Sequence, residues 1–228
     1  MGTVTILPET TENPYELMGR MAGICYGTDI ENAAKNIKRG KQCVKDGHGR
    51  VLEYPQVYMR LDGYSARCVR ELYTQIGGAP TRLQASTRYI DYTNFEYIIP
   101  PKIAKDKDTK QVYEDTMTSI SKAADFLINK CDIPKEDVAN LFPLGMTTVV
   151  SCRYNARTLM DMSRNRLCAR AYWEFRQLMH DIINALSDYS EEWNELCGEI
   201  MKCKCDVLGY CVEHQCCGKY PQKEEIDG

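Results

Sequence analysis

The middle of the chain reads Gly77-Gly78-Ala79-Pro80-Thr81-Arg82-Leu83-Gln84-Ala85-Ser86-Thr87-Arg88-Tyr89. Glycine lets a backbone approach a bound molecule closely, and exposed main-chain amides can bind anionic oxygens. Arg82 and Arg88 add planar, fork-shaped donors that suit phosphate. This composition favours a loop that binds a phosphate-bearing ligand. The alternative is a capped turn whose arginines are only solvated.

The segments on either side of this loop indicate the fold class. Apolar residues at helical spacing predict helices over 14–26, 29–47, 65–76, 109–131, 155–187 and 190–201, with a short helix opening at Pro134. β-Branched, aromatic or alternating residues predict extended segments over 57–61, 87–99 and 146–152. Helices before, between and after strands indicate an α+β fold, with helices beside a mainly antiparallel sheet.

Local signals mark several expected helix ends. Asn13 before Pro14 is typical of an N-cap followed by proline at the first helical position. Asp29 and Ser65 are further candidate N-caps, and Gly47 is a natural C-terminal stop. These residues predict where three of the helices begin and where one of them ends.

Composition limits the classes of protein that the chain can belong to. A length of 228 residues fits one domain, expected over 1–200, with a short tail over 201–228. The net charge of −3 argues against a broad basic surface for nucleic acid. No apolar run is long enough to span a membrane, and the N-terminal residues lack the pattern of a signal peptide. We therefore expect a cytoplasmic protein with neither a nucleic-acid partner nor a membrane partner.

Cysteines crowd the end of the chain. Six of them are Cys197, Cys203, Cys205, Cys211, Cys216 and Cys217, with His214 among them. Four of these thiols could supply a zinc site, but the paired Cys-x-x-Cys pattern is absent. Reduced thiols without a metal are therefore favoured, and zinc is the alternative.

The end of the central loop resembles a known signature. Gln84-Ala85-Ser86-Thr87-Arg88-Tyr89 is similar to the Glu-x-Ser-x-Arg-Tyr pattern of the ThyX family, the flavin-dependent thymidylate synthases. Ser86, Arg88 and Tyr89 match this pattern directly. Further segments resemble the family in the same order, namely 22–26, 47–54, 141–144, 155–159 and 171–176. The resemblance covers roughly residues 17 to 180 and is more specific than any single motif.

The chain also departs from the family pattern. An Arg-His-Arg triplet precedes the loop in the family, whereas this chain has Arg70-Glu71-Leu72-Tyr73-Thr74-Gln75-Ile76. Gln84 replaces the glutamate of the signature. Either Arg70 or Arg82 takes over the contact with phosphate, or the flavin is held mostly by backbone and by other subunits.

The resemblance implies a fold, an activity and a set of ligands. The family has an α/β domain that forms a homotetramer with active sites shared between subunits. It is a methyltransferase family that binds FAD, uses NADPH and methylenetetrahydrofolate as co-substrates, and converts dUMP to dTMP. Its partners are therefore dUMP and folate. The resemblance implies dUMP contacts for Arg82, Gln84, Ser86, Thr87, Arg88 and Arg166. It implies FAD contacts for His48, Glu53, Asn155, Arg157 and Asp161.

Several alternatives stay open. His48 can be a surface histidine, Asn155 can simply cap a helix, and Arg157 and Arg166 can be solvated helix arginines. The substrate can be another pyrimidine nucleotide such as UMP. The missing triplet and the cysteine-rich tail also suggest a second class, a non-catalytic protein of the same fold that binds a nucleotide or zinc.

Overall fold

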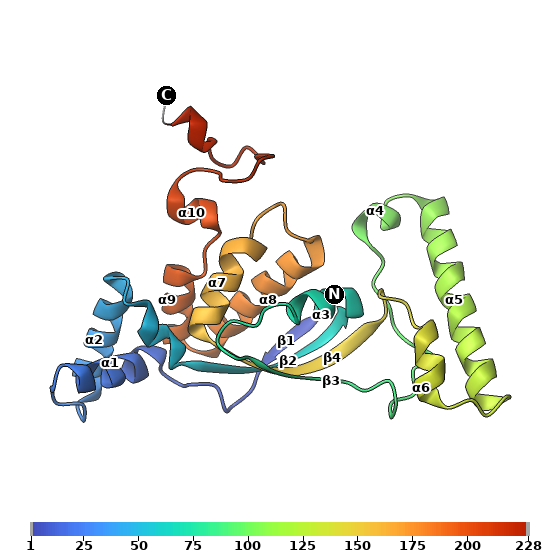
Figure 1. Ribbon diagram of the computed structural model, residues 1–228, viewed down its shortest axis with the longest axis horizontal. Coiled ribbons are helices and arrows are strands. Elements are labelled where there is room, and N and C mark those ends of the chain that lie inside the picture. The colour runs from blue at the N-terminus through green and yellow to red at the C-terminus, as the bar shows by residue number, and fades with distance from the viewer. Residues whose placement is uncertain (1, 227–228) are drawn as a thin grey trace. The chain divides into compact units, whose positions relative to one another are not determined.

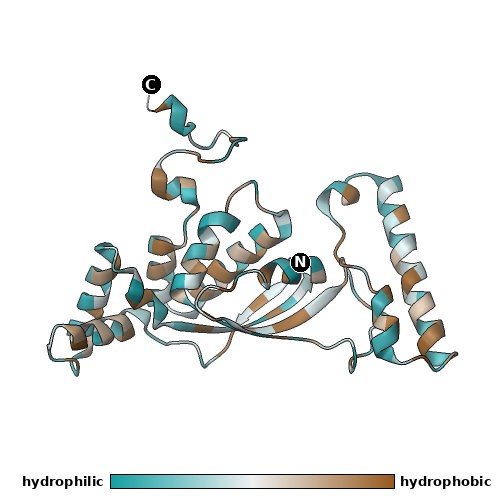
Figure 2. Cartoon of the chain, in the orientation of Figure 1, coloured by the Kyte–Doolittle hydropathy of each residue, from teal (hydrophilic) through white to brown (hydrophobic). Residues whose placement is uncertain are grey.

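A computed structural model describes residues 2–226 (Figure 1). The fold is α+β, as expected, with a small antiparallel sheet and flanking helices. The sheet order is β1-β2-β4-β3. Its strands are β1 (Thr3–Ile6), β2 (Gln56–Ser65), β3 (Thr81–Gln84) and β4 (Thr147–Asn155). Buried and accessible residues alternate along β2 and β4, and apolar and polar residues alternate along the sheet in Figure 2. This alternation is typical of strands with one covered face.

Most of the other described residues are helical. The α-helices are α1 (Pro14–Cys25), α2 (Ala33–Lys45), α3 (Ala66–Leu72), α4 (Pro101–Ala104), α5 (Lys107–Asn129), α6 (Lys135–Val138), α7 (Ala156–Arg166), α8 (Trp173–Tyr189), α9 (Glu191–Ile200) and α10 (Lys204–Leu208). Short 3-10 turns are η1 (Gly49–Glu53), η2 (Ala139–Leu141) and η3 (Lys223–Glu225). In the described part of the chain, no helix combines the length and the apolarity that crossing a membrane requires.

The described chain divides into two compact units. Unit 1 contains the residues up to Thr3, Leu61–Tyr73 and Arg82–Ser151. Unit 2 contains Val4–Arg60, Thr74–Thr81 and the residues from Cys152 onward. Each unit is described by itself below. The expected division into 1–200 and 201–228 stays a prediction.

Unit 1 has an aromatic core under helix α5. Phe95, Met117 and Met146 are buried at its centre. The partly buried residues packed against them are Tyr92, Tyr97, Tyr113, Ile120 and Phe142. The rings meet edge to face, with centroids 5.6 Å apart for Phe95 and Phe142. The segment 87–99 was expected to be a strand, but only Tyr97 forms a β-bridge, to Met146. Its aromatic residues fill the core instead of forming a ladder.

In unit 2, helices α1 and α2 cross with their backbones in close approach. A Cβ added at Gly40 would lie less than 3.0 Å from the carbonyl oxygen of Tyr15, and one at Gly19 would meet that of Asn36. Asn13 caps α1 as predicted, because its side chain accepts a hydrogen bond from the amide of Glu16. Small residues on both helices therefore set this crossing.

Helices α7, α8 and α9 supply many of the buried side chains of unit 2. Phe175, Leu178, Leu186, Leu196 and Trp193 are buried with 0% exposure. The Trp193 indole nitrogen donates to the carbonyl oxygen of Thr11 at 2.7 Å, so the polar end of this buried ring is satisfied.

Several expected element boundaries were wrong, and β2 also continues past the expected end at Leu61 to Ser65. The single helix over 155–187 is interrupted between α7 and α8, where Arg176 donates to the carbonyl oxygen of Ala169 at 2.9 Å. Helix α2 begins after Asn32, whose side chain accepts from the amide of Lys35, rather than at Asp29. Helix α3 is capped by Ser65 as predicted but already ends at Leu72. Strands β1 and β3 were not predicted, because segments of four residues carry little periodicity.

Candidate functional site

The expected site residues fall into two sets that belong to different units. Unit 2 contains His48, Glu53, Asn155, Arg157, Asp161 and Arg166. Unit 1 contains Arg82, Gln84, Ser86, Thr87 and Arg88.

A cleft of about 510 Å³ lies within unit 2. Its walls come from η1, the start of the central loop and helix α7. They include four expected residues, Glu53, Asn155, Arg157 and Asp161, together with Arg50 and Gly78. The structure therefore brings most of the expected flavin-side residues to one surface, although they lie about a hundred residues apart in the sequence.

Asn155 and Thr158 fasten the central loop to the start of α7. The Asn155 side-chain oxygen accepts from the amide of Thr158 at 2.8 Å, which is the N-cap that the sequence suggested. The Thr158 hydroxyl donates to the carbonyl oxygen of Gly77 at 2.8 Å. From the end of β4, Arg153 donates to the carbonyl oxygen of Ala79 at 3.1 Å. Thr158 and Arg153 thus bind the carbonyl oxygens of the residues before and after Gly78 and fix the loop backbone.

Gly78 is required by this arrangement. Its φ is +70°, in the left-handed region that favours glycine. A Cβ there would lie 2.6 Å from the Asn155 amide nitrogen and would also collide with the Thr158 hydroxyl. The absence of a side chain therefore lets the loop backbone pack directly against Asn155 and Thr158 at the cleft wall.

Charge is distributed unevenly along the cleft. Arg157 pairs with Asp161 at 3.0 Å, and Arg164 also approaches Asp161, at 3.8 Å. Within residues 2–226 no carboxylate forms an ion pair with the Arg50 guanidinium. Arg50 is exposed and lines the same cleft. Arg50 therefore offers the cleft a positive charge that no described carboxylate neutralises in an ion pair.

Sequence reasoning missed Arg50 and Thr158 as site residues. Arg50 lies inside the segment 47–54, which resembles the family, so a cationic side chain within that segment was the available signal. Thr158 follows the expected Asn155 by three residues, the spacing of an N-cap and its partner. Its bond to Gly77 depends on tertiary structure and has no sequence signal.

Two other expected residues of unit 2 do not line this cleft. His48 is exposed, precedes η1 and lines a separate cavity of about 370 Å³ that Arg157 also borders. Arg166 is the last residue of α7, and its guanidinium carbon lies 4.8 Å from the centroid of the Phe175 ring. Their expected ligand contacts stay predictions.

In unit 1, Arg82 and Gln84 are held by neighbouring elements. Arg82 donates to the carbonyl oxygen of Leu72 at 2.9 Å, and its guanidinium carbon lies 4.7 Å from the centroid of the Tyr73 ring. It therefore contacts the end of α3. Gln84 donates to the hydroxyl of Thr148 at 3.4 Å, which links β3 to β4.

Ser86, Thr87 and Arg88 form a turn directly after β3. The Ser86 hydroxyl accepts from the amide of Arg88 at 3.2 Å. The Arg88 guanidinium pairs with Glu136 at 2.8 Å, with both side chains more than half exposed. Exposed ion pairs are weak, so a phosphate could replace this carboxylate at small cost.

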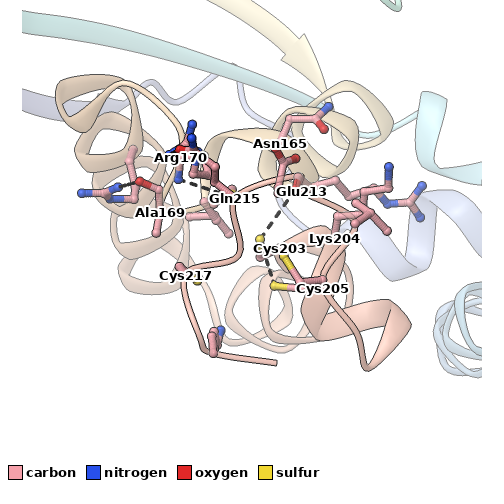
Figure 3. Close-up of a pocket in the computed structure, with 16 residues that line it drawn as sticks. Asn165, Ala169, Arg170, Cys203, Lys204, Cys205, Glu213, Gln215 and Cys217 are labelled. Atoms are coloured by element: carbon pink, nitrogen blue, oxygen red, sulfur yellow. Dashed lines mark hydrogen bonds between the residues drawn. The ribbon is translucent and has the colours of Figure 1, made fainter. Parts of the chain in front are cut away.

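The C-terminal cysteines line a separate cavity of about 150 Å³ in unit 2 (Figure 3). Its lining includes Cys203, Cys205 and Cys217, and the Cys205 thiol donates to the Cys203 sulfur at 3.5 Å. The Cys203 thiol contacts the carbonyl oxygen of Arg164 at 3.8 Å. All cysteines of the chain are free thiols. Across residues 2–226, no three His, Cys, Asp or Glu side chains gather as a metal site.

Burial predicts a clear order of thiol reactivity. Burial raises the pKa of Cys197 to about 12, and burial together with Cys203 raises that of Cys205 to about 11. At pH 8 the Cys197 thiolate is then roughly one ten-thousandth of the total, and only the thiolate reacts with alkylating agents. Alkylation followed by peptide mass spectrometry should modify the exposed Cys25, Cys131 and Cys217 first. Cys197 should react only after urea unfolding, and its early modification in the folded protein would contradict this prediction.

The fold and the cleft together define a class of protein. The α+β domain carries a cleft with a capping asparagine, a left-handed glycine and two arginines, which suits an anionic ligand that approaches backbone closely. The model of the family described as "Thymidylate synthase complementing protein" matches residues 6–189, and the chain belongs to this family.

Comparison with individual proteins also supports membership of this family. The chain is 28% identical to a flavin-dependent thymidylate synthase of Clostridium tetani, over 99% of this chain and 97% of the relative. It is 24% identical to the enzyme of the same name from Nitratidesulfovibrio vulgaris, over 80% of this chain and 76% of the relative. A crystal structure of ThyX from Helicobacter pylori with FAD and dUMP shares the fold, with a TM-score of 0.65 at 15% identity, over 86% of this chain and 99% of that one. The resemblance to the ThyX family is thereby confirmed.

Proposed function

We propose that the protein is a flavin-dependent thymidylate synthase that converts dUMP to dTMP with FAD, NADPH and methylenetetrahydrofolate. Membership of the family and the names of its relatives support this function. The observation that carries the proposal is the gathering of Glu53, Asn155 and Arg157 around one cleft. We also propose that the protein is located in the cytoplasm and forms a homotetramer with active sites shared between subunits.

The cleft of unit 2 fits part of a flavin nucleotide. Arg50 and Arg157 offer guanidinium groups for phosphate oxygens, and the backbone at Gly78 has no side chain in the way. Asn155 and Glu53 provide polar groups for ring edges or hydroxyls. His48 would contribute from the neighbouring cavity. These residues bind and orient the cofactor, and the bound flavin supplies the hydride.

The turn after β3 is the proposed site for the substrate phosphate and uracil. Ser86 and Thr87 contribute hydroxyl groups and main-chain amides, and Arg88 exchanges Glu136 for the phosphate. Gln84 and Arg82 lie at the base of the turn, where Gln84 can also bond a uracil edge. For Arg166 of unit 2, the proposed contact with dUMP rests on the resemblance to the family alone. The role of these groups is to position the uracil ring and neutralise its anionic partner.

Replacing Arg50 tests the flavin assignment. Arg50→Ala should weaken FAD binding at least about tenfold, because a charge-assisted hydrogen bond to phosphate contributes about 1.5–3 kcal/mol. Thermal stability should not change, since within residues 2–226 Arg50 forms no ion pair. Titration of flavin fluorescence gives the dissociation constant. Riboflavin, which has no phosphate, should bind the variant and the wild type equally, and Arg20→Ala provides a matched surface control.

The proposed function has its own test. The purified protein should be yellow and should form dTMP from dUMP with NADPH and methylenetetrahydrofolate. A colourless protein that binds no added FAD would overturn the proposal. FAD binding without turnover would favour the non-catalytic alternative suggested by the missing Arg-His-Arg triplet. Turnover of UMP in place of dUMP would identify the other pyrimidine substrate.

A further inference from the structure

Helix α5 of unit 1 carries a regular stripe of exposed residues. The stripe consists of Val112, Thr116, Ser119, Ala123 and Phe126 and is called the α5 seam below. Val112 is 67% exposed and Phe126 is 58% exposed. The positions alternate in steps of four and three residues, the spacing that places side chains on one seam between two packed helices.

The α5 seam is separate from the face that holds α5 in unit 1. Met117 and Ala124 are the buried residues of the helix. Tyr113 donates to the carbonyl oxygen of Ile98 at 3.0 Å, and Ser121 bonds the carbonyl oxygen of Thr93. Hydrophobic residues nonetheless recur along α5 after its polar first turn, as Figure 2 shows. The core of unit 1 therefore does not account for the exposed apolar positions.

Charged residues border the α5 seam in a self-complementary order. Asp115 and Lys122 lie on one flank, about two turns apart, while Asp108 and Lys130 lie near the two ends. Lys110 and Glu114, which are not among these bordering residues, form an ion pair within α5 at 3.6 Å. In the part of the chain that the structure describes, Lys122 and Lys130 have no carboxylate partner. The bordering aspartates thus lie before Ser119 in the sequence, and the bordering lysines lie after it.

We infer that the α5 seam docks antiparallel on the α5 seam of a second copy of this chain, about a two-fold axis near Ser119. In this register Val112 faces the partner's Phe126, and Thr116 faces the partner's Ala123. Asp115 then lies beside the partner's Lys122, and Asp108 beside the partner's Lys130. Two-fold symmetry repeats each contact, as in an isologous interface.

Charge selects this arrangement over the alternatives. Sliding one helix by seven residues would set Lys122 against the partner's Lys122, or Asp115 against the partner's Asp115. A parallel pair would set like charges together at both ends, Asp108 at one and Lys130 at the other. Like charges across a helix pair are destabilising. One helix pair covers less than the roughly 1,200 Å² of a stable interface, so we expect this contact to contribute to a larger assembly of identical chains.

Charge reversal tests the inference independently of flavin binding. Asp115→Lys and Lys122→Asp should each raise the dissociation constant of the α5–α5 contact about tenfold, because each variant loses two ion pairs and gains repulsion. The double variant should restore association, since the pairs are then reversed but complementary. Asp125→Lys carries the same charge change away from the seam and should associate like wild type. Sedimentation equilibrium over a dilution series measures all four, and equal masses would overturn the inference.

Cross-linking tests the register. Ser119→Cys should form an intermolecular disulfide between two copies of residue 119 under mild oxidation by a low-molecular-weight disulfide, which is reduced to two thiols. Thr118→Cys is also exposed but lies off the seam and should not cross-link in this way. Peptide mass spectrometry distinguishes this bond from disulfides of native cysteines. Equal cross-linking of both variants would contradict the register. Flavin titration of the same samples reports separately on the proposed function.

Discussion

Gly40→Ala should destabilise the protein by about 3 kcal/mol, near the upper end of what overpacking usually costs. Its Cβ would lie less than 3.0 Å from the carbonyl oxygen of Tyr15. That obstacle is backbone, so relief requires α1 and α2 to move apart. Separation would in turn disturb Tyr15 and Met18, both of which are fully buried. Urea unfolding followed by circular dichroism measures the change.

Gly198→Ala is the matched control for this prediction. Gly198 lies in α9, and a Cβ there would meet no atom of the described chain within 4 Å. Alanine in a helix interior is favoured over glycine by up to about 1 kcal/mol, so this variant should be neutral or slightly more stable. Equal losses in both variants would show that the crossing of α1 and α2 is not the cause.

Gly78→Ala should weaken FAD binding at least about tenfold and lower stability by about 2 kcal/mol. The left-handed conformation costs a non-glycine residue about 1–2 kcal/mol. The new methyl group would also displace Thr158 and Asn155, which hold the loop against α7. Flavin titration and urea unfolding of the same preparation separate the two effects.

Gly77→Ala isolates the role of Gly78. A Cβ at Gly77 would meet no described atom within 4 Å, and its carbonyl oxygen still accepts from Thr158. Its FAD affinity and stability should therefore remain near those of wild type. A loss at Gly77 as large as the loss at Gly78 would contradict the assigned geometry.

Local chemistry accounts for the parts of the fold that could be predicted from sequence. Asn13, Ser65 and Asn155 cap helices as predicted, because an N-cap depends on residues within one turn. The end of α7 at Arg166 could not be predicted, since no glycine or proline marks it. It depends instead on contacts such as that of Arg176 with Ala169.

The candidate site likewise has residues that the sequence indicates and contacts that depend on tertiary structure. The resemblance to the ThyX family indicated Glu53, Asn155 and Arg157, and the structure places all three at one cleft. The contact of Thr158 with Gly77 joins residues 81 positions apart, so no local pattern reveals it. The aromatic segment 87–99 gave a misleading signal, because aromatic residues favour strands and cores alike.

The division into two units limits which fragments of this protein can be produced by truncation or deletion. Each unit is made of separate stretches of chain, and strands β2 and β4 both pass from one unit into the other. No single cut in the gene therefore yields a fragment containing one whole unit and nothing else. A protease nick at the crossing inside β2 or inside β4 would sever that strand. We accordingly expect deletion mapping to fail for this enzyme. The proposed binding of FAD and the proposed binding of dUMP should be separable only by point substitutions.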